Sequence, residues 1–173
     1  MIAPIDVLPL ISQMSHDISR LNLSNPLFIG IHTGGVWIAE KIHQQLLPEG
    51  IDTHGSLGAL DISFYRDDFM EVGINPEVGG SHLPHSIDDR NIVLIDDVLY
   101  SGRTIRAAMN EIFAYGRPAT IKLAVLIDRG GKQLPIQADV IGCQLTLDNN
   151  QYAKLKNTDS GLQIDIVQSE EDQ

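Results

Sequence analysis

Two adjacent carboxylates and a short turn of small residues form the most chemically specific stretch of the sequence. Asp96 and Asp97 directly follow four branched apolar residues at positions 92–95, and Gly102 stands in the turn that comes next. If a helix begins after this turn, backbone N–H groups converge there and, with the helix dipole, favour a phosphate monoester. The expected donors are the backbone groups of Tyr100, Ser101, Gly102, Arg103 and Thr104, with the hydroxyls of Ser101 and Thr104 added.

The carboxylates restrict what such a phosphate can belong to. They would repel a phosphate, so Asp96 and Asp97 are better suited to accept hydrogen bonds from sugar hydroxyls or to lie behind a hydrated Mg²⁺. A sugar phosphate meets both demands. The turn has neither the G-x-x-x-x-G-K-[ST] pattern of a P-loop nor the three glycines of a dinucleotide fold, which disfavours nucleoside triphosphates and NAD. The alternative interpretation is a strand that ends in solvated aspartates.

The elements that must position these groups alternate between strand and helix. Residues 92–95 are typical of a buried parallel strand that ends at the carboxylates. After them, helical spacing continues to Gly116, which is suited to a helix C-cap. The apolar side of this predicted helix comprises Ile105, Ala108, Met109, Ile112 and Phe113.

Similar patterns occur before and after this unit. Apolar periodicity predicts helices over residues 6–22 and through Ile38, Ile42 and Leu46. Strands are expected at residues 27–31, 58–64 and 121–127, and residues 151–155 and 162–166 are expected to pair as a hairpin. The class is therefore α/β with a mostly parallel sheet, in which ligands bind at the carboxyl ends of the strands.

Composition narrows the class of protein. The chain has 173 residues, 43% of them hydrophobic, which suits one compact domain. Its formal net charge of -11 opposes nonspecific binding of nucleic acid. Cys143 is the single cysteine and follows apolar residues, which indicates a buried, inert thiol. Neither a membrane-spanning run nor a signal peptide is apparent, so we expect a cytoplasmic protein.

The stretch from Ile92 to Thr104 resembles the phosphoribosyl pyrophosphate (PRPP) signature of type I phosphoribosyltransferases. The longer string D-D-V-L-Y-S-G-R-T-I-R-A-A-M is similar to the family of bifunctional pyrimidine operon attenuation proteins and uracil phosphoribosyltransferases. Three more stretches support the narrower resemblance, which covers most of residues 5–145. They are L-D-I-S-F-Y-R-D-D-F at 60–69, Y-G-R-P-A-T-I at 115–121 and D-R-G-G-K-Q-L-P-I-Q-A-D at 128–139.

The resemblance implies a type I phosphoribosyltransferase fold, a twisted and mostly parallel sheet flanked by helices, in a single domain over residues 1–173. It adds a flexible loop at about 66–90, a small hood at about 128–145 and an acidic tail at about 168–173. The loop after the first core strand, in which Thr33, Gly34 and Gly35 stand, is expected to contact pyrophosphate through backbone amides in an unusual peptide geometry. Here it reads H-T-G-G where the family reads R-T-R-G, so two cationic side chains are missing. A plain tight turn is the alternative.

The resemblance also distributes roles along the chain. Asp96 and Asp97 would hold the ribose hydroxyls, and Tyr65 and Arg66, at the start of the long loop, would shield PRPP from water. Asp128 would orient a Mg²⁺-bound water or, nearly as plausibly, cap a turn. The base would meet backbone groups of the hood, where Pro135 stands, and apolar surface from Val98, Leu99 and Ile136.

The implied reaction is Mg²⁺-dependent transfer of the 5-phosphoribosyl group from PRPP to uracil, which gives UMP and pyrophosphate. Two alternatives remain open: a UMP-sensing RNA-binding regulator, disfavoured by the acidity of the chain, and a binding module that has lost turnover. An oligomer could gather Arg20, Lys41, Arg106 and Lys132 on one face to bind RNA. Family resemblance also implies a homodimer or a larger homo-oligomer.

Overall fold

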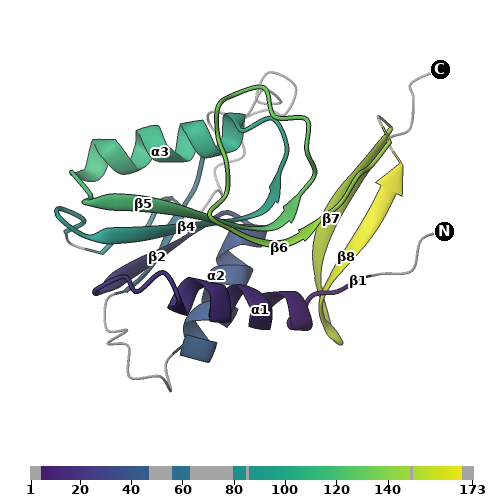
Figure 1. Ribbon diagram of the computed structural model, residues 1–173, viewed down its shortest axis with the longest axis horizontal. Helices are drawn as coiled ribbons and strands as arrows, with labels where there is room; N and C mark the ends of the chain where they lie inside the picture. The colour runs from purple at the N-terminus through teal and green to yellow at the C-terminus, as the bar shows by residue number, and fades with distance from the viewer. Residues whose placement is uncertain (1–4, 47–55, 63–79, 85, 149, 169–173) are drawn as a thin grey trace.

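The computed structural model describes residues 5–46, 56–62, 80–84, 86–148 and 150–168. Two sheets and three helices make up this part of the chain (Figure 1). The elements in order are β1 (Ile5–Asp6), α1 (Leu8–Ser19), β2 (Pro26–Ile31), α2 (Gly34–Leu46), β3 (Leu57–Leu60), β4 (Asn91–Leu99), α3 (Arg103–Tyr115), β5 (Thr120–Asp128), β6 (Val140–Gln144), β7 (Gln151–Thr158) and β8 (Gly161–Gln168).

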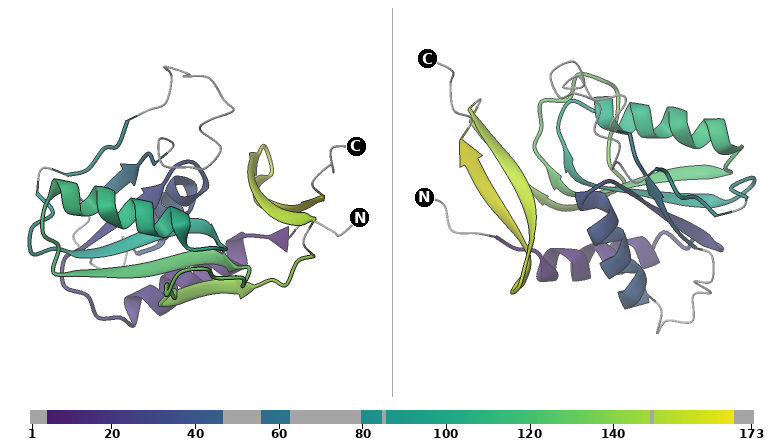
Figure 2. Two further views of the ribbon diagram at one scale, coloured as in Figure 1. Left: turned by 90° about the horizontal axis from the view of Figure 1, so that it is seen from above. Right: turned by 180° about the vertical axis from the view of Figure 1, so that it is seen from behind.

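The central sheet has five parallel strands in the order β3-β2-β4-β5-β6. Helix α3 covers one face, and α1 and α2 cover the other (Figures 1 and 2). From β2 the chain moves outward to β3, and from β4 it moves in the opposite direction to β5 and β6. The strand order therefore reverses between β2 and β4, and in such sheets the crevice at this reversal is where ligands bind.

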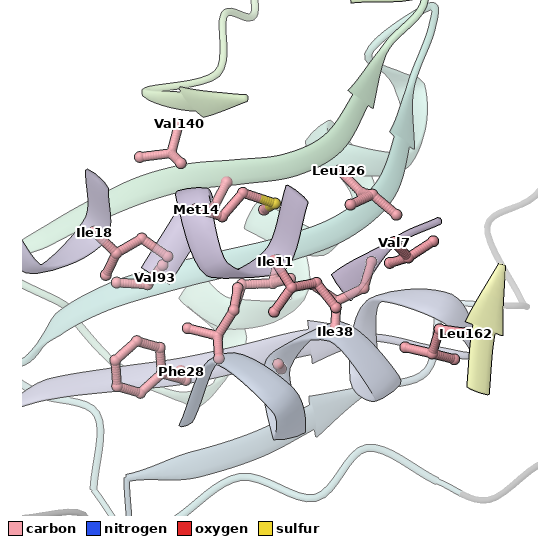
Figure 3. Close-up of a cluster of buried hydrophobic side chains, with 14 of the residues drawn as sticks. Val7, Ile11, Met14, Ile18, Phe28, Ile38, Val93, Leu126, Val140 and Leu162 are labelled. Atoms are coloured by element: carbon pink, nitrogen blue, oxygen red, sulfur yellow. The ribbon is translucent and has the colours of Figure 1, made fainter. Parts of the chain in front are cut away.

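Alternation along the strands builds a core on each side of the sheet. On β4, Val93 and Ile95 join the cluster beneath α1 and α2, while Ile92 and Leu94 join the cluster beneath α3. Figure 3 shows the first cluster, in which Phe28 and Val93 from the sheet meet side chains of α1 and α2. Burial on both faces explains why these strands are continuous apolar runs.

A second, antiparallel sheet of order β1-β8-β7 lies beyond the end of β6 in Figure 1. Its strands β7 and β8 form the expected hairpin, which begins at Gln151 as predicted. Both strands are longer than predicted, and β8 begins at Gly161 after the turn and ends at Gln168. Leu155, Leu162 and Ile164 bury their side chains in the first core cluster. The small sheet is thus packed onto the same core as the central sheet.

Several sequence-based boundaries differ from the structure. The first helix is shorter than residues 6–22 at both ends, because Asp6 belongs to β1 and the helix ends at Ser19 with Arg20 as its C-cap. Phe113 is 47% exposed rather than buried on the apolar side of α3. The predicted hood at 128–145 includes β6, a strand of the central sheet. In the predicted loop at 66–90, Ile87 is buried and His82 forms an antiparallel bridge with Ala59. Residues 66–79 and 85 of that loop, and residues 169–173 of the tail, lie outside the described residues.

Cys143 lies half-buried on β6, and burial raises the pKa of its thiol. A raised pKa leaves little thiolate at neutral pH, which agrees with the expectation of an unreactive cysteine. Within the described residues, no helix is long and apolar enough to cross a membrane.

Candidate active site

The acidic pair lies inside β4 rather than at its end, because the strand continues through Leu99. Asp96 is 4% exposed, and its Oδ1 accepts a hydrogen bond from the backbone N–H of Asp97 (3.0 Å). Asp97 is half-buried, and its Oδ1 accepts from the N–H of Val98 (2.9 Å). Each carboxylate is thus fixed by a backbone donor through one oxygen. Asp97 is the more accessible of the two.

The turn after β4 ends at a helix N-terminus, as the sequence predicted. Gly102 is buried with a φ of 90° and is the N-cap of α3, so a left-handed backbone requires glycine there. Arg106 N–H donates to the Gly102 carbonyl (3.0 Å), and Arg103 N–H donates to Ser101 Oγ (3.3 Å). The first N–H groups of a helix have no acceptor within the helix, so those of α3 are directed toward this turn.

The loop after β2 comes directly against the acidic pair. A Cβ on Gly34 would overlap the carboxylate of Asp97, and a Cβ on Gly35 would overlap the carbonyl of Ile95. Both glycines belong to α2, and neither has a positive φ, so they are needed for space rather than for backbone freedom. Thr33 is exposed at the tip of the loop, and the peptide bond between His32 and Thr33 is cis. The start of α2 therefore lies against β4 at the reversal between β2 and β4.

Asp128, the last residue of β5, is held by the segment that follows the strand. Asp128 is 6% exposed; its Oδ1 accepts from Gly130 N–H (3.0 Å), and its Oδ2 is 2.6 Å from Lys132 Nζ. Burial alone would raise the pKa of Asp128, but the bonds from Lys132 and Gly130 and the charge of Lys132 lower it below its ordinary value. These bonds match the alternative in which Asp128 caps a turn.

The residues expected to face the base divide into two groups. Leu99 is 1% exposed and packs in the core cluster beneath α3, so its side chain does not supply the expected apolar surface for a ring. Val98 is half-buried, Pro135 is exposed, and Ile136 lies beside Gly102, whose Cβ would be 3.3 Å from Ile136 Cδ1. Tyr65 and Arg66 lie outside the described residues.

Two residues of this region make contacts that the sequence analysis did not predict. Arg129 lies over the ring of Tyr100, with its guanidinium carbon 4.3 Å from the ring centre. Gln133 accepts a hydrogen bond from Arg103 Nε (3.2 Å). Each contact joins segments about 30 positions apart, and only the position of residues 129–133 just after a strand could have indicated it.

Comparisons with known proteins identify the family of the chain. The family described as phosphoribosyl transferase domain matches residues 5–156, so the chain belongs to that family. The fold alone is also similar to solved phosphoribosyltransferases. A hypoxanthine-guanine phosphoribosyltransferase from Bacillus anthracis has a TM-score of 0.61 at 16% identity, over 82% of each chain. A Trypanosoma cruzi hypoxanthine phosphoribosyl transferase has a TM-score of 0.62 at 17% identity, over 87% of this chain and 80% of that chain.

Bacterial relatives that share the name bifunctional protein PyrR are much more similar in sequence. The protein from Nitrosococcus oceani is 54% identical over 79% of this chain and 75% of that protein. One from Pseudomonas aeruginosa is 46% identical over 88% of this chain and 87% of that protein. These similarities confirm the narrower family resemblance of the sequence.

Proposed function

We propose that this chain transfers the 5-phosphoribosyl group of PRPP to N1 of uracil, with release of pyrophosphate and formation of UMP. One observation carries the proposal: Gly34, at the start of α2, lies against Asp97, and the turn at residues 100–104 follows Asp97 at the end of β4. The acidic pair therefore lies between the loop after β2 and that turn. PRPP presents the same sequence of groups, a pyrophosphate, a pair of ribose hydroxyls and a 5′-phosphate.

Each group of PRPP has a fitting place along this edge. The 5′-phosphate would accept hydrogen bonds from the turn at residues 100–104 and from the helix N-terminus that follows it. Asp97 and Asp96 would accept hydrogen bonds from the ribose hydroxyls. Pyrophosphate would meet backbone N–H groups of the loop at residues 32–35, where helix α2 begins. Holding all three groups positions C1 of the ribose for attack by the base.

Catalysis in this scheme depends on charge stabilisation and on the exclusion of water. Positive charge develops on the ribose ring as pyrophosphate departs, and the carboxylates beside the ring stabilise it. Exclusion of water from C1 would prevent hydrolysis of PRPP. We assign that role to Tyr65 and Arg66, which lie outside the described residues.

The site is suited to Mg²⁺ that arrives with PRPP. Among the described residues, no three His, Cys, Asp or Glu side chains are grouped to hold a metal ion. Mg²⁺ commonly binds through one or two carboxylates together with substrate phosphates and water, and Asp96 and Asp97 are such carboxylates. The ion would neutralise charge on the pyrophosphate as it leaves.

A panel of free bases tests the proposal. Purified protein, PRPP and Mg²⁺ are incubated with uracil, orotate, hypoxanthine, guanine or xanthine, and nucleotide and pyrophosphate are measured together. We expect UMP and pyrophosphate in equal amounts, and only with uracil. Turnover with a purine alone would contradict the base assignment while retaining the site. No product with any base would contradict transferase activity.

A second candidate function is RNA-binding regulation of pyrimidine genes, which the word bifunctional in the relatives' name favours. Of the cations considered for RNA, Arg20 and Lys41 lie on the side of α1 and α2, while Arg106 lies on α3 across the sheet (Figure 1). Lys132 is paired with Asp128. One protomer therefore does not gather them on one face, and we propose that a homodimer or larger homo-oligomer in the cytoplasm would be required.

The RNA proposal has its own test. A UMP-dependent mobility shift of pyrimidine leader RNA that weakens steeply with salt would support it. Light scattering would give the number of protomers in the same preparation. A monomer that shifts RNA equally with and without UMP would contradict it.

A further inference from the structure

The turn after β4 is held by the segment that follows β5, which we call the brace and define as residues 129–136. Arg129 is fixed at three points. Its backbone N–H donates to the Leu99 carbonyl (2.9 Å), its Nη2 donates to the Asp148 carbonyl (3.3 Å), and its guanidinium lies over the ring of Tyr100 at 4.3 Å. The last distance is within the range of a cation–π contact.

The ring of Tyr100 is bounded by a second part of the brace. Gly131 has a φ of 73°, and a Cβ there would lie 2.6 Å from Tyr100 Cε2, so the backbone of the brace touches the ring. Tyr100 directly precedes Ser101 and Gly102 in the turn. A shift of its ring would therefore move the backbone that is expected to bind phosphate.

The rest of the brace contacts the turn after β4 directly. The Ser101 carbonyl accepts hydrogen bonds from the N–H groups of Gln133 (2.9 Å) and Leu134 (3.2 Å). Gln133 Oε1 accepts from Arg103 Nε (3.2 Å), and Ile136 packs beside Gly102. Every residue from Tyr100 to Arg103 thus has a partner in the brace. A turn fixed in this way before its ligand arrives avoids the cost of ordering it on binding.

We propose that Arg129 is a positioning residue for the 5′-phosphate, which acts through the ring of Tyr100 and does not touch the phosphate. The inference rests on the proposed placement of the 5′-phosphate at the turn after β4. It adds that affinity for the phosphate depends on the stack of the Arg129 guanidinium on the Tyr100 ring. Pyrophosphate, which is placed at the loop after β2, should be insensitive to this stack.

Binding of two probes to the protein without a base tests the inference independently of turnover. Dissociation constants for ribose 5-phosphate and for pyrophosphate with Mg²⁺ are measured by calorimetry on Arg129→Met and Tyr100→Leu. Each variant should bind ribose 5-phosphate about five- to tenfold more weakly, the size of one partly exposed cation–π contact. Binding of pyrophosphate should change less than twofold.

The two variants control for each other. Tyr100→Leu keeps the positive charge of Arg129, so weaker binding in this variant cannot come from a lost charge near the phosphate. The double variant should be no weaker than the weaker single variant, because both changes remove the same contact. Arg129→Lys keeps a cation over the ring and should recover part of the affinity. If Arg129→Met does not fold, Tyr100→Leu and Arg129→Lys still test the stack.

Arg90→Met is a matched control at the far end of the strands. Arg90 also donates to a backbone carbonyl, that of Asn25 at 3.3 Å, so its loss imitates the structural role of Arg129 without the stack. It should leave both dissociation constants unchanged. The inference is overturned if Arg129→Met equals Arg90→Met, if the two single effects add in the double variant, or if pyrophosphate binding falls in parallel. If the wild-type protein binds both probes and the variants show the expected pattern, but the wild type does not turn over uracil, only the proposed reaction is contradicted.

Discussion

The loops after β2 and after β4 occupy the same edge of the sheet but are held in different ways. The loop after β2 is fixed by contact with the sheet, since Gly34 and Gly35 leave room only for Asp97 and Ile95 of β4. The turn after β4 is fixed by the brace, through Tyr100, Ser101 and Gly102. The position of the first loop requires residues without side chains, and the position of the second is held by contacts from the brace.

This difference indicates which changes each loop tolerates. Any added atom at Gly34 or Gly35 must displace the backbone or a carboxylate of β4, which lies in the centre of the sheet. A change in the brace alters one turn and leaves the strands in place. We therefore expect mutations in the first loop to affect folding and function together, and mutations around the second to affect phosphate binding more selectively.

Gly35→Ala should have the largest effect. Its Cβ would overlap the Ile95 carbonyl, and overpacking of this kind costs about 1–3 kcal/mol, more than the gain of about 1 kcal/mol that alanine brings to a helix. Urea unfolding should show a lower free energy of unfolding, and turnover should fall with it. Gly80→Ala is the control, because no atom lies within 4 Å of its Cβ. Equal stability of the two variants would remove the proposed difference between the loops.

Asp97→Asn should lower kcat/KM by about 10- to 100-fold, since hydrogen bonds to a charged group contribute about 1.5–3 kcal/mol. The fold should survive, because an amide oxygen can still accept from Val98 N–H. Steady-state kinetics and thermal unfolding measure the two effects separately. Asp165→Asn, which alters a surface ion pair with Lys156 in the small sheet, should leave turnover unchanged. Near wild-type kinetics for Asp97→Asn would discard the ribose assignment.

Gly102→Ala should reduce stability by about 1–2 kcal/mol, because L-residues disfavour a φ of 90° and the Cβ would press on Ile136. Ribose 5-phosphate should bind more weakly, and pyrophosphate should bind as before. Gly130→Ala is the matched control, with a φ of 75° and open space around its Cβ. If the two variants bind ribose 5-phosphate equally well, packing of the brace on Gly102 does not shape the turn.

Lys132→Met should have the smallest effect, about 1 kcal/mol at neutral pH, because the lysine is partly exposed. The pKa of Asp128 is lowered in the folded protein, so its ionised form stabilises the fold above its ordinary pKa of 3.8. That contribution is lost as the pH falls through the folded-state pKa. The difference in unfolding free energy between wild type and variant should therefore shrink below pH 3.8. A pH-independent difference would show that Lys132 acts through packing alone.

Much of the fold could be predicted because local patterns and the fold agree. The apolar run before Asp96 marks the central strand, helical spacing after Thr104 marks α3, and Gly116 marks the end of that helix. The turn after β4 was predictable for the same reason, since a left-handed N-cap leaves few choices besides glycine. The roles of the site residues remain predictions that the kinetics above would test.

Leu99 shows where local reasoning stops. Its place after the acidic pair predicted an exposed apolar surface, but the alternation of faces changes near the end of β4. Val98 packs with the cluster beneath α1 and α2, and Leu99 packs with the cluster beneath α3. The alternation of side chains along a strand does not predict this change of face. The change depends on where the helices that cover the sheet lie.

The sequence alone determined the order of the elements from α1 to β5, the hairpin of β7 and β8, the acidic pair and the two glycine-containing loops, since each depends on residues close together in the chain. Only the tertiary structure placed Gly34 against Asp97 and Arg129 over Tyr100. Those contacts join segments about 30 to 60 positions apart, and their geometry is set by the reversal of strand order between β2 and β4 and by the pairing of β4 with β5. Such contacts depend on how the strands are ordered and paired in the sheet, and patterns of residues close together in the sequence do not show this order.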